Sequence, residues 1–148
     1  EFAGLDHRHL TIHEADGVRW VDDSKATNVG AALAALKGYT DGSVHLNLGG
    51  QAKGQDFSIM VPEVRRAAAC VYLIGIDGPT IGSAIEGTTP VVECGTLDEA
   101  VRCARGRVRP GQWVVLAPAC ASFDQFADYH ERGQTFAELA RMEEAPCP

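Results

Sequence analysis

Polar side chains that could hold an anion are concentrated in the seven residues at positions 22–28. This stretch reads Asp-Asp-Ser-Lys-Ala-Thr-Asn. Ser24, Thr27 and Asn28 are all good helix N-caps, and the free backbone N–H groups at a helix start favour an anion beside them. Lys25 adds a mobile positive charge in the same place. The stretch is therefore either a capped helix start with solvated charges or part of an anion-binding site.

A second candidate is the single lysine in the glycine-rich run at positions 49–54. Lys53 is followed by Gly54, so the run does not match the Gly-x-x-x-x-Gly-Lys-Ser/Thr pattern of a nucleotide P-loop. Ligands of α/β proteins nevertheless bind at the carboxyl ends of strands, which is where this run is expected to lie. Lys53 is therefore either an anion contact or a solvated loop lysine.

A third candidate is the run of small residues at positions 117–122, which ends in a hydroxyl. Small residues let the backbone approach a ligand, and the Ser122 hydroxyl beside free N–H groups could hold a carboxylate. A nucleophilic serine is disfavoured, because Ala121 and Phe123 replace the glycines of the Gly-x-Ser-x-Gly pattern. Cys120 has no activating cation adjacent in sequence. Ser122 is therefore a helix cap or a ligand contact.

Two further cationic segments flank these candidates. His-Arg-His at positions 7–9 is a compact cluster that is either solvated or part of a site. Residues 129–134 are expected to interrupt the last helix, which would resume over 135–142. That interruption would place Arg132 where it can fold back, the alternative being a salt-bridged surface arginine.

The elements that must position these residues alternate between strand and helix. The hydrophobic pattern predicts strands at 9–14, 18–22, 43–48, 70–76, 91–94 and 112–116, and helices at 29–39, 58–69, 80–86, 97–105 and after Ser122. Such alternation predicts an α/β fold with a Rossmann-like, doubly wound, mostly parallel sheet. Ala-Asp-Gly at positions 15–17 predicts an antiparallel β-hairpin at its start.

Composition limits the class of protein. The 148 residues are 45% hydrophobic and 22% charged, which fits one domain spanning residues 1–148. A net charge of −7 argues against a nucleic-acid partner, and no apolar run is long enough to span a membrane. The five cysteines show no zinc-ligand spacing, and most are expected to be buried thiols in a reducing cytosol. The first residue is Glu1 rather than Met, which suggests a piece of a longer polypeptide.

Four motifs, in their order and spacing, resemble the C-terminal domain of the Mur ligases. They are Gly4-Leu5-Asp6-His7-Arg8, Asp23-Ser24-Lys25-Ala26-Thr27-Asn28, Gly49-Gly50-Gln51-Ala52-Lys53 and Pro118-Ala119-Cys120-Ala121-Ser122-Phe123-Asp124-Gln125-Phe126. The resemblance covers residues 2–143. Sister ligases and folylpolyglutamate synthases tend to carry an Asp-x-Ala-His type segment where this chain has residues 23–27. The chain is therefore most similar to the branch that adds D-glutamate.

The resemblance implies a cytoplasmic enzyme of three domains that makes peptidoglycan precursors. An N-terminal domain would bind the UDP substrate, a central domain would bind ATP and Mg²⁺, and this domain would bring in D-glutamate and close over the ATP site. The alanyl carboxylate of UDP-N-acetylmuramoyl-L-alanine would be activated as an acyl phosphate and attacked by the D-glutamate amine. The chain carries no Walker loop and no obvious magnesium cluster, so alone it is expected to bind no cofactor and to be inactive.

The resemblance also implies roles for individual residues. The D-glutamate contacts would be Thr27, Lys53, Ser122, Phe123 and Tyr129, the last in a position where the best-known relatives have Phe. The nucleotide-facing residues would be His7, Arg8 and Asp23. The catalytic group would be Arg8, Asp23, Lys25 and Arg132, with Lys25 and Arg132 near the transferring phosphate or supporting the site, and no residue is expected to bind a metal. The competing interpretation is a stand-alone Rossmann-like module for a nucleotide or an acidic metabolite, although no Gly-x-Gly-x-x-Gly follows the first strand.

Overall fold

An antiparallel hairpin begins the sheet, as predicted. A computed structural model describes residues 7–142, which leaves Gly4, Leu5 and Asp6 of the first motif outside the described residues. Strands β1 (Leu10–Ala15) and β2 (Val18–Asp22) pair antiparallel. Asp16 and Gly17 between them have φ values of 55° and 77°. Two left-handed residues in a two-residue turn match the right-handed twist of the flanking strands.

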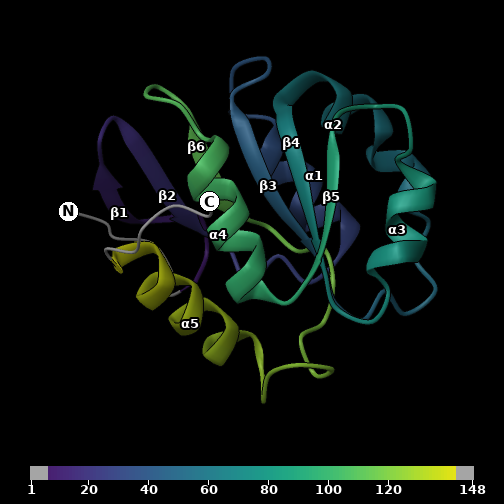
Figure 1. Ribbon diagram of the computed structural model, residues 1–148. Coiled ribbons are helices and arrows are strands. Elements are labelled where there is room, and N and C mark those ends of the chain that lie inside the picture. The colour runs from purple at the N-terminus through teal and green to yellow at the C-terminus, as the bar shows by residue number, and fades with distance from the viewer. Residues whose placement is uncertain (1–6, 143–148) are drawn as a thin grey trace.

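The remaining strands extend the hairpin into a parallel sheet. They are β3 (Val44–Gly49), β4 (Ala68–Ile74), β5 (Val91–Gly95) and β6 (Trp113–Leu116). The strand order is β1-β2-β6-β3-β4-β5, and every neighbouring pair from β2 onward is parallel (Figure 1). The loops that leave β2, β6 and β3 therefore emerge side by side at one edge. The predicted mostly parallel α/β sheet is confirmed.

Helices cover both faces of this sheet, which makes it doubly wound. One hydrophobic core contains residues of α1 (Val29–Leu36), the 3-10 helix η1 (Phe57–Met60), α2 (Val61–Ala67) and α3 (Gly78–Ala84). The other contains residues of α4 (Leu97–Arg107) and α5 (Tyr129–Arg141). Figure 1 shows α4 in front of the sheet and α1 behind it. Alternate residues of β4 enter opposite cores, Val71 and Leu73 the first, and Tyr72 and Ile74 the second.

The structure changes the bounds and the first turn of one predicted helix, and it shows that the predicted break in the last helix was wrong. The helix expected over 58–69 begins as the 3-10 turn η1, and Pro62 lies in the first turn of α2, where its missing N–H costs least. The chain then enters β4 directly at Ala68. The break expected at 129–134 is absent, because α5 runs continuously from its N-cap Asp128, whose side chain accepts from the N–H of Glu131.

Gly133 lies inside α5 for a packing reason, not as a helix breaker. A Cβ atom at this position would collide with Nδ1 of His7 and would lie 2.7 Å from Oδ2 of Asp22. The glycine lets the helix approach the end of β2 closely. No helix within residues 7–142 is long and apolar enough to cross a membrane.

The cysteines of residues 7–142 are all free thiols. Cys70 and Cys120 are buried, whereas Cys94 and Cys103 are partly exposed. Cys147 lies outside the described residues. Burial therefore holds for two of the four, and no group of three or more His, Cys, Asp or Glu side chains in the described part of the chain could hold a metal ion.

Candidate functional site

Hydrogen bonds tie together the three loops that carry the candidate ligand residues. The N–H of Ala119 donates to the carbonyl of Ala26 at 2.9 Å, which joins the loop after β6 to the loop after β2. Gln51 and Ala121 form an isolated antiparallel bridge, with N–H to carbonyl distances of 3.0 and 3.2 Å, which joins the loops after β3 and β6. The three loops are therefore neighbours, as predicted, and backbone hydrogen bonds join them.

Two glycines make this close approach possible. Gly49 and Gly50 have φ values of 133° and 132°, a region that L residues rarely adopt. A Cβ atom on Gly49 would collide with the carbonyl oxygen of Ile74, and one on Gly50 with the carbonyl oxygen of Ala121. The glycine-rich run therefore packs closely against the end of β4 and the loop after β6.

Three polar groups on the joined loops have no hydrogen-bond partner within residues 7–142. They are the hydroxyls of Thr27 and Ser122 and the ammonium of Lys53. The ammonium lies 5.7 Å from the centre of the Phe123 ring, whose side chain is 63% exposed. Ser122 itself is only 3% exposed and does not cap a helix, because α5 begins at Tyr129. These groups are free to bind a ligand, and Lys53 supplies the full positive charge.

Tyr129 lies in the first turn of α5 and contacts Lys25. The lysine ammonium donates to the phenol oxygen at 3.1 Å and lies 4.7 Å from the ring centre. The Tyr129 ring also stacks on His130, with centroids 4.2 Å apart. Lys25, which was expected from the sequence to be mobile, is thus held in place by the side chain of Tyr129.

Arg132 does fold back toward the site, from within an unbroken helix. It is 1% exposed, so the alternative of a salt-bridged surface arginine is wrong. Its guanidinium donates to the hydroxyl and the carbonyl of Ser24 at 2.9 and 2.7 Å and to the carbonyl of Cys120 at 2.9 Å. Burial lowers the pKa of Arg132 to about 10, so the group remains charged at neutral pH. Its donors are used on protein acceptors, which fits a role in supporting the site.

Asp22 is an important residue that the sequence analysis did not single out. Its side chain is buried, accepts from the N–H of Ser24 at 2.9 Å and lies 2.6 Å from Nδ1 of His7. The carbonyl of His7 in turn accepts from the N–H of Lys25 at 3.0 Å. Asp22 thereby fixes the residue that precedes Arg8. The sequence did contain a signal for this role, namely an aspartate at the last position of a predicted strand and a histidine upstream of it.

A cavity of about 420 Å³ lies beside the nucleotide-facing candidates. Arg8, His9, Asp23 and Lys25 line it, together with small residues from the following segment, namely Ala26, Ala31, Ala34, Ala35 and Gly38. Nδ1 of His9 lies 3.9 Å from Asp23. This cavity combines cations, one carboxylate and an apolar surface. Thr27, Lys53 and Ser122 do not line it, so the two groups of candidates do not share this cavity.

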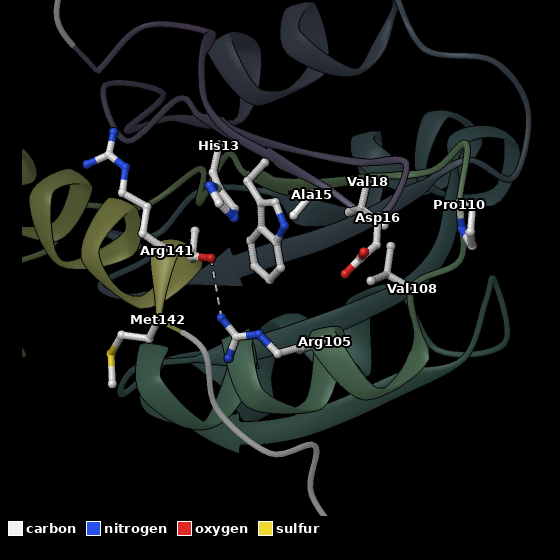
Figure 2. A pocket seen from close by; sticks show the side chains of 11 residues that line it. His13, Ala15, Asp16, Val18, Arg105, Val108, Pro110, Arg141 and Met142 are labelled. Atoms are coloured by element: carbon white, nitrogen blue, oxygen red, sulfur yellow. Dashed lines mark hydrogen bonds between the residues drawn. The ribbon is translucent and has the colours of Figure 1, made fainter.

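A larger cavity, of about 670 Å³, lies at the other end of the sheet (Figure 2). Its lining includes Asp16 and Val18, which precede or begin β2, whereas the loops described above leave the carboxyl ends of the strands. Figure 2 shows Arg105 reaching across it toward the end of α5. Arg105 lies over the Trp20 ring, 5.3 Å from its centre, and donates to the carbonyl of Leu139. This cavity therefore lies at the amino-terminal end of β2, away from the candidate site at the carboxyl ends of the strands.

The fold and these loops define an α/β domain that presents cations and hydroxyls at the carboxyl edge of a parallel sheet. Residues 7–120 match the family described as Mur ligase, glutamate ligase domain. The chain belongs to this family. The resemblance inferred from the four motifs is therefore confirmed.

Individual relatives are similar over nearly the whole chain. The UDP-N-acetylmuramoylalanine–D-glutamate ligase of Methylococcus capsulatus is 49% identical over 140 residues, which are 95% of this chain and 30% of that protein. The enzymes of the same name from Hahella chejuensis and Bordetella parapertussis are 44% and 49% identical. The chain spans only 27% to 32% of the length of these three relatives.

Two solved structures share the fold at low sequence identity. A murein peptide ligase from Psychrobacter arcticus superposes with a TM-score of 0.62 at 16% identity, over 97% of this chain and 32% of that one. A bifunctional folylpolyglutamate synthase/dihydrofolate synthase from Yersinia pestis also gives 0.62, at 15% identity, over 93% of this chain and 32% of that one. These similarities support the fold alone.

Proposed function

We propose that this chain is the D-glutamate-binding, domain-closing part of an ATP-dependent ligase. The full enzyme would add D-glutamate to UDP-N-acetylmuramoyl-L-alanine during peptidoglycan precursor synthesis in the cytoplasm. The relatives named D-glutamate ligases, at 43% to 49% identity, support the substrate. The observation that carries the proposal is the junction of three loops that offers one ammonium and two hydroxyls with no hydrogen-bond partner among residues 7–142.

The chemistry of the amino acid fits this junction. D-Glutamate carries two carboxylates, and each needs short, charge-assisted hydrogen bonds to replace water. Lys53 would neutralise one negative charge, while Thr27 and Ser122 would donate from the neighbouring loops. Phe123 follows Ser122, so its backbone N–H would add a donor and its exposed ring would cover the aliphatic part of the substrate. Tyr129 would act beside these residues, through its contact with Lys25.

The cavity lined by Arg8, Asp23 and Lys25 would face the nucleotide when the domains close. ATP would supply the phosphoryl group that activates the alanyl carboxylate. In this chain Arg8 and Lys25 would meet the phosphates or the nucleotide, Asp23 would accept from its hydroxyls, and His7 would hold Arg8 in place. Arg132 would support both groups of residues through its hydrogen bonds to Ser24 and Cys120. The residues described here hold no cluster suited to Mg²⁺, so that ion would be held mainly by the central domain.

Closure of the domain would also protect the reaction. An acyl phosphate is hydrolysed by water, and a closing domain that excludes water protects such an intermediate. This chain by itself would then bind neither the UDP substrate nor ATP productively, and it is expected to be inactive. The competing interpretation of a stand-alone module for a nucleotide or an acidic metabolite can be tested by reading the gene upstream of Glu1. Several hundred further codons that include a Walker loop would exclude it.

The kinetic test of the proposal uses the full-length enzyme that contains this chain. Removing the ammonium with Lys53→Ala should raise the KM for D-glutamate by about 10- to 100-fold, the value of a charged hydrogen bond. The KM for ATP should change by less than about twofold, because Lys53 lies outside the Arg8 cavity. Lys37→Ala, on an exposed lysine just after α1, serves as the control. Equal effects of Lys53→Ala on both KM values would contradict the assignment.

A further inference from the structure

The side chain of Gln55 bonds to backbone groups in two loops of the proposed D-glutamate site and at the start of the helix that follows the third. Its Oε1 accepts from the N–H of Val29 at 2.8 Å. Its Nε2 donates to the carbonyl of Ala52 at 2.8 Å and to the carbonyl of Ala119 at 3.0 Å. The single amide thus satisfies one backbone group at the start of α1, directly after the loop that follows β2, one in the loop after β3 and one in the loop after β6.

Each bonded backbone group lies close to a candidate ligand residue. Val29 is two residues after Thr27, Ala52 immediately precedes Lys53, and Ala119 is three residues before Ser122. No other residue of the described chain is placed by the structure to fix all three at once. Gln55 therefore adds to the backbone bonds that already join these loops, which are Ala119 to Ala26 and Gln51 to Ala121.

The backbone at these points requires such a support. Lys53 and Ala119 have φ values of 53° and 60°, a left-handed conformation that is strained for residues other than glycine. Val29 is the first residue of α1, and the Asn28 cap accepts from the N–H of Ala31 and not from that of Val29. Without the Gln55 amide, the N–H of Val29 and the carbonyl of Ala119 would lose these partners, whereas the carbonyl of Ala52 would keep the backbone N–H of residue 55 at 3.3 Å.

Glutamine is the side chain that this geometry demands. It must accept one hydrogen bond and donate two from one planar group at a fixed reach. Glutamate of the same length has no N–H to donate, asparagine is one methylene shorter, and methionine has the length but no strong donor or acceptor. Gln55 itself exposes no atom that the proposed chemistry uses, so its effect must act through the loops.

We propose that Gln55 is a positioning residue that fixes the spacing of Thr27, Lys53 and Ser122 and thereby selects an acid with the carboxylate separation of D-glutamate. This inference rests on the proposed function, because it assigns the length selectivity of that same site. D-Aspartate is one methylene shorter and carries the same charge. A rigid spacing of the three loops rejects it, whereas loops that move independently accommodate both acids poorly and with less discrimination.

The test compares two variants of the full-length ligase with the wild-type enzyme. Gln55→Met preserves the size of the side chain and removes all three hydrogen bonds, while Gln55→Glu keeps an acceptor for Val29 and removes both donors. Gln134→Ala, on an exposed glutamine of α5, is the matched control. The measured quantities are the KM for D-glutamate, the KM for ATP, and the ratio of kcat/KM for D-glutamate to that for D-aspartate.

Both Gln55 variants should lower kcat/KM for D-glutamate by about 10- to 100-fold, since a displacement near 1 Å in a binding site has effects of that size. The ratio of D-glutamate to D-aspartate should fall by about tenfold or more, while the KM for ATP should stay within about twofold of wild type. Gln134→Ala should leave all three quantities unchanged. The ratio is the decisive readout, because the extra charge of Gln55→Glu acts equally on both acids.

The other outcomes overturn the inference. If a Gln55 variant loses thermal stability but keeps the wild-type ratio and the wild-type KM for D-glutamate, the residue is only structural. Gln55→Glu carries the test if Gln55→Met does not fold. A wild-type enzyme without D-glutamate-dependent phosphate release would overturn the proposed function and this inference together. An active wild type with unchanged ratios in the variants would overturn the role of Gln55 alone.

Discussion

Arg132 and Ser24 are separated by 108 positions in the sequence, yet two hydrogen bonds join them inside the protein. The third donor of Arg132 reaches the carbonyl of Cys120. One guanidinium therefore fastens the loop after β2 to the loop after β6, in addition to the backbone bond between Ala119 and Ala26. Ser24 also connects the loop after β2 to α5, because its hydroxyl donates to the carbonyl of Tyr129 at 2.7 Å.

Replacing Arg132 should therefore destabilise the whole domain. Arg132→Met keeps much of the aliphatic volume but leaves the buried carbonyls of Ser24 and Cys120 without donors, at a cost of about 3 kcal/mol in the free energy of unfolding. Arg132→Lys should recover only part of this, because one ammonium cannot reproduce the planar fork. Urea denaturation of the full-length variants measures the loss.

Arg65→Lys provides the control for Arg132, since Arg65 is exposed on α2. It should change the free energy of unfolding by less than about 0.5 kcal/mol. If Arg132→Lys were as stable as wild type, the forked contact between Ser24 and Cys120 would not matter for stability, and the supporting role of Arg132 would have to be abandoned.

Two helical glycines should respond in opposite directions to alanine. At Gly133 the new Cβ would collide with His7 and approach Asp22, so Gly133→Ala should destabilise the protein by about 1–3 kcal/mol. At Gly106 in α4 a Cβ would meet no atom within 4 Å, so Gly106→Ala should stabilise it by about 0.5–1 kcal/mol through helix propensity. Paired thermal unfolding experiments measure both. Stabilisation by Gly133→Ala would show that α5 can move away from the end of β2.

Sequence patterns predicted the parts of the structure that are decided locally. Asp16 and Gly17 specify their turn by their own conformational preferences, and the apolar runs specify strands whose neighbours then follow the usual topology rules. The motifs located Thr27, Lys53 and Ser122 on three loops that the structure does join. These features need no knowledge of distant contacts.

The features that the sequence did not predict depend on partners far along the chain. Gly133 looked like a helix breaker because its neighbour His7 lies on another segment. Asp22 and Asp23 are adjacent and chemically identical, and only the fold decides that Asp22 pairs with His7 and Ser24. Gln55 gains its importance from three backbone groups in three segments, and no local pattern records that arrangement.

Asp22 should affect the nucleotide side of the site more than the D-glutamate side. Asp22→Ala removes the acceptor for the N–H of Ser24 and the partner of His7, the residue that precedes Arg8. In the full-length enzyme the KM for ATP should rise by about tenfold, with a smaller rise in the KM for D-glutamate. Asp22→Asn keeps an oxygen acceptor and should restore part of the effect.

The control for Asp22 is Asp98→Ala, on an exposed aspartate in the first turn of α4. It should leave both KM values unchanged. A larger effect of Asp22→Ala on the KM for D-glutamate than on that for ATP would reverse the expected order and would argue that Asp22 supports Thr27 rather than Arg8.

His45 should make the protein less stable as the pH falls below about 7. It is buried on β3, where Nδ1 lies 2.8 Å from the phenol oxygen of Tyr72 and Nε2 lies 2.9 Å from Oε1 of Gln112. Burial lowers the pKa of His45 below its usual value, while the hydrogen bond to Gln112 opposes that change and the charge of Arg107 adds to it. The unfolded chain therefore takes up this proton at a higher pH than the folded chain does.

It follows that the stability contributed by neutral His45 is complete above the unfolded pKa of 6.5 and is lost as the pH decreases through that value. The free energy of unfolding should fall between pH 7 and pH 5, and His45→Gln should show a shallower slope because its side chain does not titrate. The carboxylates of Asp56 and Glu99, whose pKa values are lowered, would lose their contributions only at more acidic pH. Parallel slopes for wild type and His45→Gln over this range would show that His45 is not the group responsible.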